Sequence, residues 1–263
     1  MEIGYQGKKL EELESLSATE KANMLFIVQD PYTSYYDAKV VRDFVALTQK
    51  LGFEPILLPF KPNGKAMHIK GFLTRFSKTA KTQAEFLNRV AKLNVPLVGV
   101  DPAIVLSYRD EYKEALGDSR GDFHVLTAHE WLTSQLESNA LQSAVKNIAK
   151  SDHTFEWHLF PHCTESTFMP NSPKEWQHIF AQFGQTLKVE KVGCCGMAGV
   201  FGHEVQNQTM SKDIYDVSWG KKLQGKDPNH CLATGYSCRS QVKRYEKAIL
   251  KHPVQALLEV LNN

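Results

Sequence analysis

The cysteines are the residues of this sequence whose placement best fits metal-binding chemistry. Cys194 and Cys195 are adjacent and flanked by glycines, so little side-chain bulk surrounds the two thiols. Cys163 lies 31 residues before this pair, and Cys238 lies 43 residues after it. Soft thiolate sets of this size select zinc or iron–sulfur clusters. We therefore predict one metal site formed by Cys163, Cys194, Cys195 and Cys238, with Gly196 allowing the backbone to approach the bound group closely.

Simple packing is the alternative for these thiols, because buried cysteines without a ligand are common. Cys231 lies in a short apolar run at 229–233, and for this residue we favour the packing interpretation. Thiol redox chemistry at Cys194 and Cys195 is a weaker third interpretation, because adjacent cysteines form only a strained ring disulfide. The sequence assigns no residue a catalytic role.

The composition indicates a cytoplasmic protein. Five cysteines in 263 residues, an odd number in a chain without a signal-peptide pattern, argue against a disulfide framework. The formal net charge is only +2 and no long block of like charge occurs, so nothing indicates nucleic-acid binding. The longest apolar runs, such as residues 24–28, are too short to span a bilayer, which leaves only peripheral membrane contact open.

Strand-like and helix-like segments alternate along the chain and predict an α/β fold with mainly parallel sheets. We expect each cysteine of the site to follow a strand, so that the thiols meet where parallel strands end. The expected strands are 23–29, 54–60, 95–100, 122–126, 155–160, 186–192 and 229–234. The expected helices are 37–51, 71–93 with breaks, 102–115, one from 127, 172–184, 204–223, 237–251 and one from 253. Residues 138–150 are expected to be further helix or connector.

The two halves of the sequence repeat the same landmarks. Gly52 and Gly184, each placed between a helix and a strand, are 132 positions apart, and Gly64 and Gly196 have the same separation. Landmarks that keep one offset indicate a tandem duplication. We therefore predict two pseudo-symmetric α/β units, at residues 23–120 and 121–263, preceded by a linker or docked helix at residues 1–22.

Three strings together resemble the cysteine-rich CCG domain. They are Pro-His-Cys at 161–163, Cys-Cys-Gly-Met-Ala-Gly-Val-Phe-Gly at 194–202 and Tyr-Ser-Cys-Arg-Ser-Gln at 236–241. This domain occurs in the B subunit of heterodisulfide reductase and in the C subunit of anaerobic glycerol-3-phosphate dehydrogenase. The sequence is most similar to the C-terminal region of FAD-linked D-2-hydroxyacid dehydrogenases of the D-lactate and D-2-hydroxyglutarate type, in which two CCG units occur in tandem.

The resemblance implies an iron–sulfur module that transfers electrons or supports a cofactor within an FAD-linked oxidoreductase. The expected partners are FAD-binding and ferredoxin-type domains of the same enzyme or complex, so FAD is expected only in a partner domain. No dehydrogenase activity is expected from this chain alone. The alternative is a structural zinc module that docks within the same assembly and has no redox activity.

Two departures from the family pattern affect the cofactor. The family motif ends in Cys-x-x-Cys, but Gly235 stands at the earlier position, so one ligand is lost unless Cys231 supplies it. The four remaining cysteines fit a cubane [4Fe–4S] cluster or a tetrahedral zinc site. In the first unit, Asp30, Pro62-Asn63-Gly64 and Ile104 stand where the cysteines would be, which implies a scaffold without a cofactor.

Overall fold

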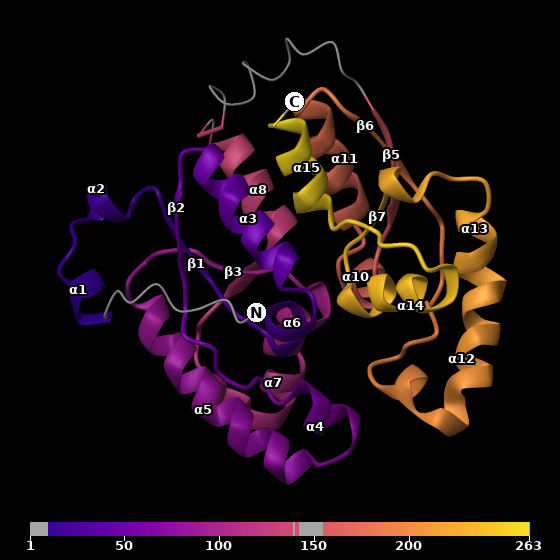
Figure 1. Ribbon diagram of the computed structural model, residues 1–263. Coiled ribbons are helices and arrows are strands. Elements are labelled where there is room, and N and C mark those ends of the chain that lie inside the picture. Colours follow the sequence, from indigo (N-terminus) through magenta and orange to yellow (C-terminus); the bar gives the residue numbers. More distant parts are fainter. Residues whose placement is uncertain (1–9, 139, 142–154, 263) are drawn as a thin grey trace. The chain divides into compact units, whose positions relative to one another are not determined.

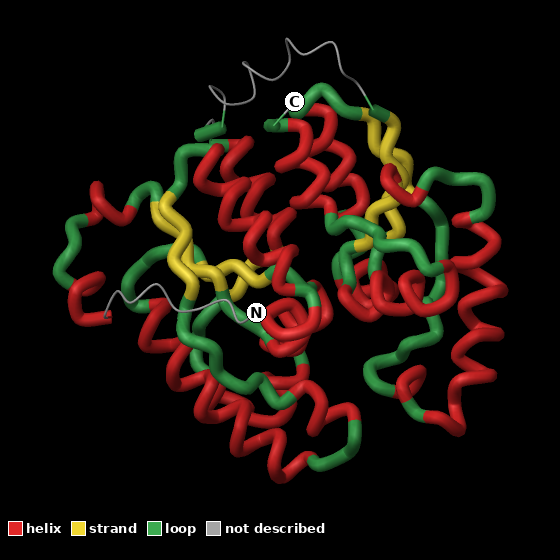
Figure 2. The backbone as a smooth tube through the Cα atoms, viewed as in Figure 1, coloured by secondary structure: helices red, strands yellow, loops and turns green. Residues whose placement is uncertain are grey.

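The computed structural model describes residues 10–138, 140–141 and 155–262, and the chain divides into two compact units (Figure 1). The first unit comprises residues 1–131 and the second comprises residues 132–263. Each unit has its own parallel sheet, drawn in yellow in Figure 2. Two parallel sheets with helices between successive strands confirm the predicted fold class, an α/β protein of two tandem units.

The first unit is built on a parallel sheet with the strand order β2-β1-β3-β4. All four residues of the central strand β1 are buried, as expected for a parallel strand with both faces covered. The strands are β1 (Met24–Ile27), β2 (Glu54–Leu57), β3 (Leu97–Gly99) and β4 (Val125–Thr127). The helices of this part of the chain are α1 (Leu10–Glu14), α2 (Ala18–Lys21), α3 (Ala38–Lys50), α4 (Lys65–Ile69), α5 (Leu73–Ala91), α6 (Pro102–Arg109), α7 (Glu111–Leu116) and α8 (Ala128–Glu137).

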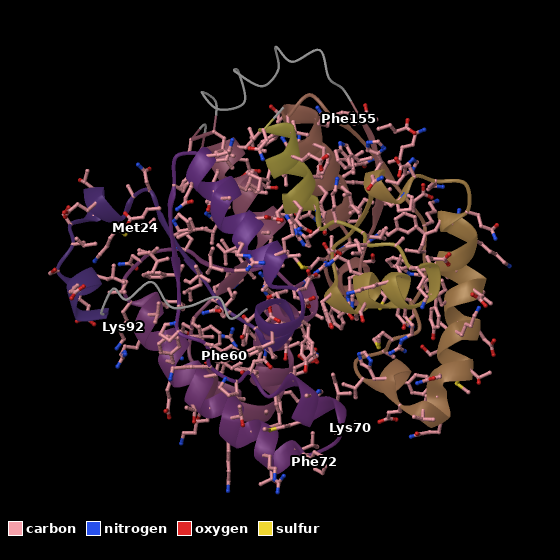
Figure 3. All side chains as sticks on the ribbon, in the orientation of Figure 1. Met24, Phe60, Lys70, Phe72, Lys92 and Phe155 are labelled. Carbon is pink, nitrogen blue, oxygen red and sulfur yellow. The ribbon has the colours of Figure 1, made fainter. Side chains whose placement is uncertain are left out.

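The longest helix of this unit, α5, buries one face against the sheet core. Its buried positions recur every three or four residues, which is the spacing of one helix face. Those in the hydrophobic cluster are Phe76, Ala80, Ala84, Leu87 and Val90. Burial of a large apolar side chain contributes about 1.5–3 kcal/mol, so this face fixes α5 on the sheet. Figure 3 shows how densely side chains fill the space around β1, which begins at the labelled Met24.

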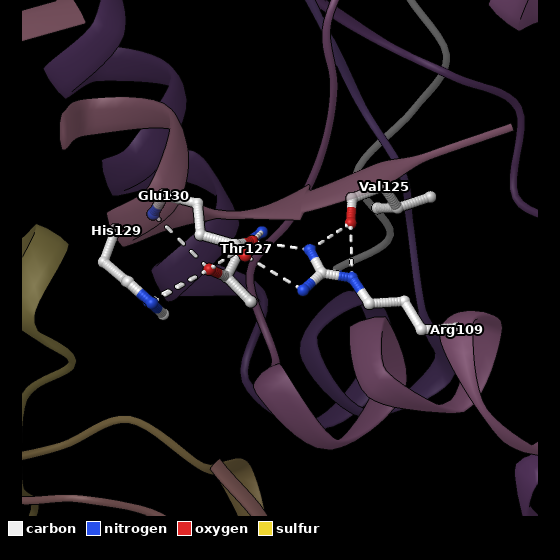
Figure 4. A network of polar contacts seen from close by, with 5 residues as sticks. All are labelled: Arg109, Val125, Thr127, His129 and Glu130. Carbon is white, nitrogen blue, oxygen red and sulfur yellow. Dashed lines mark hydrogen bonds and ion pairs between the residues drawn. The ribbon is translucent and has the colours of Figure 1, made fainter. Parts of the chain in front are cut away.

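An ion pair holds the end of β4 between α6 and α8 (Figure 4). Arg109 donates through Nη1 to Glu130 at 2.9 Å and through Nη2 to the Val125 carbonyl oxygen at 2.6 Å. Glu130 also accepts a hydrogen bond from the backbone N–H of Thr127 at 2.8 Å. Burial alone would raise the pKa of Glu130, but these hydrogen bonds lower it. The network therefore joins β4 to α6 and α8.

The second unit repeats this plan with the strand order β6-β5-β7, again parallel throughout. The strands are β5 (Glu156–Phe160), β6 (Thr186–Val189) and β7 (Cys231–Ala233). The helices are α10 (Cys163–Phe168), α11 (Ser172–Gln182), α12 (Gln208–Tyr215), α13 (Lys221–Leu223), α14 (Tyr236–Glu246) and α15 (Pro253–Val260). A buried cluster between these elements includes Phe160, Met197, Tyr215, Trp219, Cys231 and Val242.

Strand register shows the internal repeat directly. Met24 pairs with Glu54 in the first sheet, and Glu156 pairs with Thr186 in the second, so both partners are displaced by 132 positions. The fourth strand of the first sheet corresponds in the second to a single parallel bridge between Leu232 and Lys251. A helix follows at the equivalent place in each case: α8, which crosses the division at residues 131 and 132, follows β4, and α15 follows Lys251. The two units are therefore related by pseudo-symmetry, with the second sheet shortened.

Several boundaries in the structure differ from those expected from the sequence. β4 pairs with β3, so it belongs to the first sheet, although the predicted division of the chain at residues 120 and 121 precedes it. The expected continuous helix at 204–223 is instead α12 and α13 with a π-helical turn, η5 (Asp216–Gly220), between them. The expected segment 138–150 lies largely outside the described residues. No helix in the described ranges combines the length and hydropathy needed to cross a membrane.

Candidate metal centre

The second sheet places the four cysteines at one edge. β5 ends at Phe160 and Cys163 opens α10, while β7 ends at Ala233 and Cys238 lies in the first turn of α14. β6 ends before the loop that carries Cys194 and Cys195. Because the three strands are parallel, their carboxyl ends meet at the same edge, where ligands bind in open α/β sheets.

The four thiols contact one another in a row. The sulfur of Cys194 accepts hydrogen bonds from the thiols of Cys163 and Cys195, and these bonds lower the pKa of Cys194. The hydrogen bond to Cys194 and then burial raise the pKa of Cys163. Cys195 donates to Cys194 and also interacts with Cys238, and these contacts raise its pKa. Interactions between neighbouring thiols therefore run from Cys163 through Cys194 and Cys195 to Cys238.

Access to the thiols differs along the row. Cys195 and Cys238 are buried, whereas Cys163 and Cys194 are half-buried. Within the described part of the chain, no group of three or more His, Cys, Asp or Glu side chains stands ready to hold a metal ion. The thiols thus interact in pairs. The Cys238 end of the row is buried in the apolar cluster, and the Cys163 end is half-buried.

Backbone N–H groups of the loop point toward the Cys194 sulfur. Gly196 donates to this sulfur at 3.3 Å, and the backbone of Ala198 contributes a second hydrogen bond that lowers the pKa of Cys194. Gly196, Ala198 and Gly199 have φ angles of +83°, +40° and +70°. Successive N–H groups in such conformations form concave sites that stabilise negative charge. The loop is therefore suited to a thiolate or to the sulfur atoms of a cluster.

Helix α12 supports this loop from behind. The hydroxyl of Ser211 donates to the Gly196 carbonyl oxygen at 2.7 Å and accepts from Gln241 Nε2 at 2.8 Å. Gln241 also donates to the Cys195 carbonyl oxygen at 2.9 Å. A Cβ atom at Gly196 would lie 2.1 Å from the Ser211 carbonyl oxygen, so only glycine fits there. Sequence reasoning assigned no role to Ser211, which lies outside the cysteine strings, or to Gln241, which ends the third string but is not a cysteine ligand.

The turn after α12 fixes the start of the loop. Gly193 N–H donates to the Ser218 hydroxyl at 2.7 Å, and Trp219 Nε1 donates to the Gly193 carbonyl oxygen at 3.1 Å. Both side chains come from the π-helical turn η5, which lets consecutive residues reach the same glycine. Such turns occur frequently at functional sites. The distortion that interrupts the expected long helix is therefore connected to the cysteine loop.

His162 fills the space beside Gly235. A Cβ atom at Gly235 would lie 2.3 Å from His162 Cδ2, so the ring stands where a side chain at position 235 would begin. His162 Nδ1 accepts from the Thr164 N–H at 3.2 Å, and Nε2 lies 3.2 Å from the Ser237 hydroxyl. His162 is buried with both ring nitrogens in contact with polar partners, so it supports the turn before Cys163.

Other residues considered from the sequence occupy structural positions. Cys231 is fully buried, and burial raises its pKa to about 11. Arg239 is buried, and its Nη1 donates to the carbonyl oxygens of Ala233 and Thr234. It therefore ties α14 to the end of β7.

The first unit has a buried polar group at the equivalent edge. Asp30 follows β1 and Asp101 follows β3, and both are buried. Burial and then the charge of Asp101 raise the pKa of Asp30 to about 6. Asn63 is also buried, and Ile104 lies in the apolar cluster. The positions that match the cysteines therefore carry oxygen, nitrogen and carbon atoms in place of sulfur.

Comparison with known proteins connects this chain to dehydrogenases. It is 81% identical over 261 residues to D-2-hydroxyglutarate dehydrogenase of Haemophilus influenzae, which covers 99% of the chain and 25% of that protein. It is 59% identical over 252 residues to the Escherichia coli K12 D-2-hydroxyglutarate dehydrogenase, covering 96% and 24%. The chain thus spans about a quarter of the length of these relatives.

A more distant similarity extends to a second dehydrogenase. The chain is 22% identical over 241 residues to the C subunit of the anaerobic glycerol-3-phosphate dehydrogenase of Escherichia coli K12, covering 88% of the chain and 57% of that protein. No model of a known protein family matches the chain. The chain is therefore similar to part of two kinds of dehydrogenase.

Proposed function

We propose that this chain is the iron–sulfur module of an FAD-linked D-2-hydroxyacid dehydrogenase, and that D-2-hydroxyglutarate is the substrate of the whole enzyme. The observation that carries the proposal is the row of four contacting thiols in a chain 81% identical to a D-2-hydroxyglutarate dehydrogenase. Thiolates in this number are the usual ligands of a [4Fe–4S] cluster. The module transfers electrons or supports the cofactor that does.

The residues of the second unit fit such a cluster. Cys163, Cys194, Cys195 and Cys238 would hold it, with two thiols in the apolar core and two half-buried. The N–H groups that already point at Cys194 are of the kind that tune cluster potentials, together with solvent exposure. When bound, the cluster supplies a site that stores and passes single electrons.

The chain's own residues bind and shield this group. Ser211 and Gln241 hold the cysteine loop in place, and the buried side of the row excludes water from Cys195 and Cys238. Hydride removal from the substrate would take place at FAD in another domain, and a ferredoxin-type domain would be a further partner. We expect no dehydrogenase activity from this chain alone.

A structural zinc site is the second candidate, and the donor set itself favours it. Four thiolates are also the full complement of a closed tetrahedral zinc site. In that case the module would dock within the same assembly and carry no electrons. The two candidates share the ligands and differ in the metal.

Metal analysis of the anaerobically purified protein tests both candidates. The iron–sulfur proposal requires brown protein with about four iron atoms and four acid-labile sulfides per chain, whereas the alternative requires one zinc and no sulfide. The variant Cys194→Ser should lose most of the metal. Cys231→Ser is the matched control, because Cys231 shares the apolar cluster of Cys195 and Cys238 but lies outside the thiol row. Equal loss of metal in both variants, or no metal in the parent protein, would overturn the assignment.

A further inference from the structure

One side of helix α12 faces the cysteine loop, and the opposite side carries exposed apolar residues. On the inner side, Ser211, Tyr215 and Trp219 are buried. The outer side carries Met210, Ile214 and Val217, which are 60%, 36% and 71% exposed, and the preceding turn adds Val205 at 82%. We call these four residues the outer stripe, and α12 forms the edge of the second unit in the view of Figure 1.

Three of the four residues of the outer stripe have the spacing of a helix face. Met210, Ile214 and Val217 are separated by four and three residues, so they lie along one side of the helical segment. Single exposed apolar side chains are ordinary on protein surfaces, but an aligned row of them marks an interaction surface. A helix that is apolar on both sides is normally covered on both.

Two charged residues of the same segment are paired with each other. Lys212 forms an ion pair with Asp216, four residues further along the helix. Lys212 also lies over the Tyr245 ring, with its Nζ atom 5.7 Å from the ring centroid. Lys212 and Asp216 therefore have partners within the unit and lie on the side of the helix away from Met210 and Val217. The exposed Asp213 lies three residues after Met210 and four before Val217, on the same side as both. A partner for this face would therefore present an apolar patch.

The relatives indicate what that partner is. This chain matches only 24–25% of the length of D-2-hydroxyglutarate dehydrogenases that are 59–81% identical to it. About three quarters of each relative therefore lies outside the matched region, on the same polypeptide and within reach of it. In a multidomain enzyme, exposed apolar surface of one domain is typically where another packs.

We propose that the outer stripe is the docking surface for the remaining part of a dehydrogenase polypeptide of the kind that these relatives represent. The proposal rests on the proposed function in taking that enzyme as the whole. Because Ser211, Ser218 and Trp219 bond to the cysteine loop from the inner side of the same segment, only one helix separates the partner from the loop. A helix with its side chains is about 10–12 Å across. Docking at the outer stripe brings the partner to about that distance from Cys194 and Cys195.

Co-expression of two pieces tests the docking surface. One piece is this chain, and the other is the Haemophilus influenzae relative without its matched 261 residues, carrying an affinity tag. The amount of this chain recovered on the tag is compared for the parent sequence, Met210→Glu and Val217→Glu. Ile249→Glu is the matched control, because Ile249 is 73% exposed in the same unit and lies outside the outer stripe. Circular dichroism of each purified variant monitors folding, which exposed substitutions should leave unchanged.

We expect the parent chain and Ile249→Glu to be recovered equally. Each variant of the outer stripe should weaken binding by at least about tenfold, equivalent to about 1.4 kcal/mol. Circular dichroism of the tagged piece establishes that it is folded. With a folded piece, failure of the parent chain to be recovered would overturn the proposal, and so would undiminished recovery of Val217→Glu. The proposal would also be overturned if this chain dimerised through the outer stripe and bound the other piece equally well with and without the substitutions. Metal content is measured on the same samples, so that loss of docking with metal retained is distinguished from failure of the iron–sulfur assignment.

Discussion

Replacing Gly196 by alanine should cost more than its backbone conformation alone requires. At φ +83° an alanine is in the left-handed region, which costs about 1–2 kcal/mol. The added Cβ atom would also lie 2.1 Å from the Ser211 carbonyl oxygen, a contact that forces backbone to move. Overpacking of this kind typically costs a further 1–3 kcal/mol, so we expect a total loss of roughly 2–5 kcal/mol.

Gly184→Ala separates the two contributions. Gly184 has φ +68°, and a Cβ atom there would meet nothing within 4 Å, so only the backbone cost of about 1–2 kcal/mol applies. Urea unfolding of both variants and of the parent chain measures the free energies of unfolding. Metal content measures whether the cysteine loop still binds. Gly196→Ala should lose metal, because the loop must shift away from α12, and Gly184→Ala should retain it.

The close approach of the loop to α12 is the premise of this comparison. Equal destabilisation by Gly196→Ala and Gly184→Ala would show that the contact with Ser211 carries no energetic weight. Full metal content in Gly196→Ala would show that the loop tolerates displacement. Either result would refute the argument that α12 positions the thiols.

Three further substitutions test polar groups elsewhere in the chain. Asp30→Asn should gain up to about 3 kcal/mol of stability relative to the parent as pH rises from 4 to 7. The reason is that the pKa of Asp30 is raised from 3.8 to about 6, so that its ionisation destabilises the fold. Urea unfolding at several pH values measures this difference in stability, and a difference that does not depend on pH would contradict the prediction. Ser211→Ala should lower the free energy of unfolding by about 1–3 kcal/mol and speed amide hydrogen exchange around Gly196. The reason is that the buried Gly196 carbonyl and the Gln241 side chain each lose a hydrogen bond. Unchanged hydrogen exchange would count against a supporting role for the hydroxyl. Glu130→Gln should lower the free energy of unfolding in urea by about 1.5–3 kcal/mol, because the charged hydrogen bonds from Arg109 are weakened. If Glu130→Gln lowered it equally in an Arg109→Met background, the two side chains would not be coupled.

The pattern of apolar residues determined most of the fold. The alternation of short apolar runs with amphipathic segments is a local property, and it predicted parallel strands at β1, β3 and β5 and the helices α3, α5 and α11. The offset between Gly52 and Gly184 predicted the internal repeat, because a duplicated unit keeps its turns where the backbone needs positive φ. The shared register displacement of 132 positions in the two sheets agrees with it.

The membership of β4 was decided by pairing. Val125–Thr127 is a strand by its local pattern, but its neighbour β3 lies more than twenty residues earlier in the chain. Sequence patterns carry no information on which strand it joins, and the hydrogen bonds with β3 and the ion pair of Arg109 and Glu130 place it in the first sheet. The same holds for the break between α12 and α13, where contacts of Ser218 and Trp219 with Gly193 compete with regular helix geometry.

The sequence by itself named the four cysteines, because their residue types and the glycines around them are local features. Only the tertiary structure brought Cys163, Cys194, Cys195 and Cys238 into one row, since that requires three parallel strands to end at the same edge. It also determined which side of α12 holds the cysteine loop and which side is left exposed. Ser211 and Val217 are residues of the same helical segment, and their opposite environments depend on packing that no local pattern specifies.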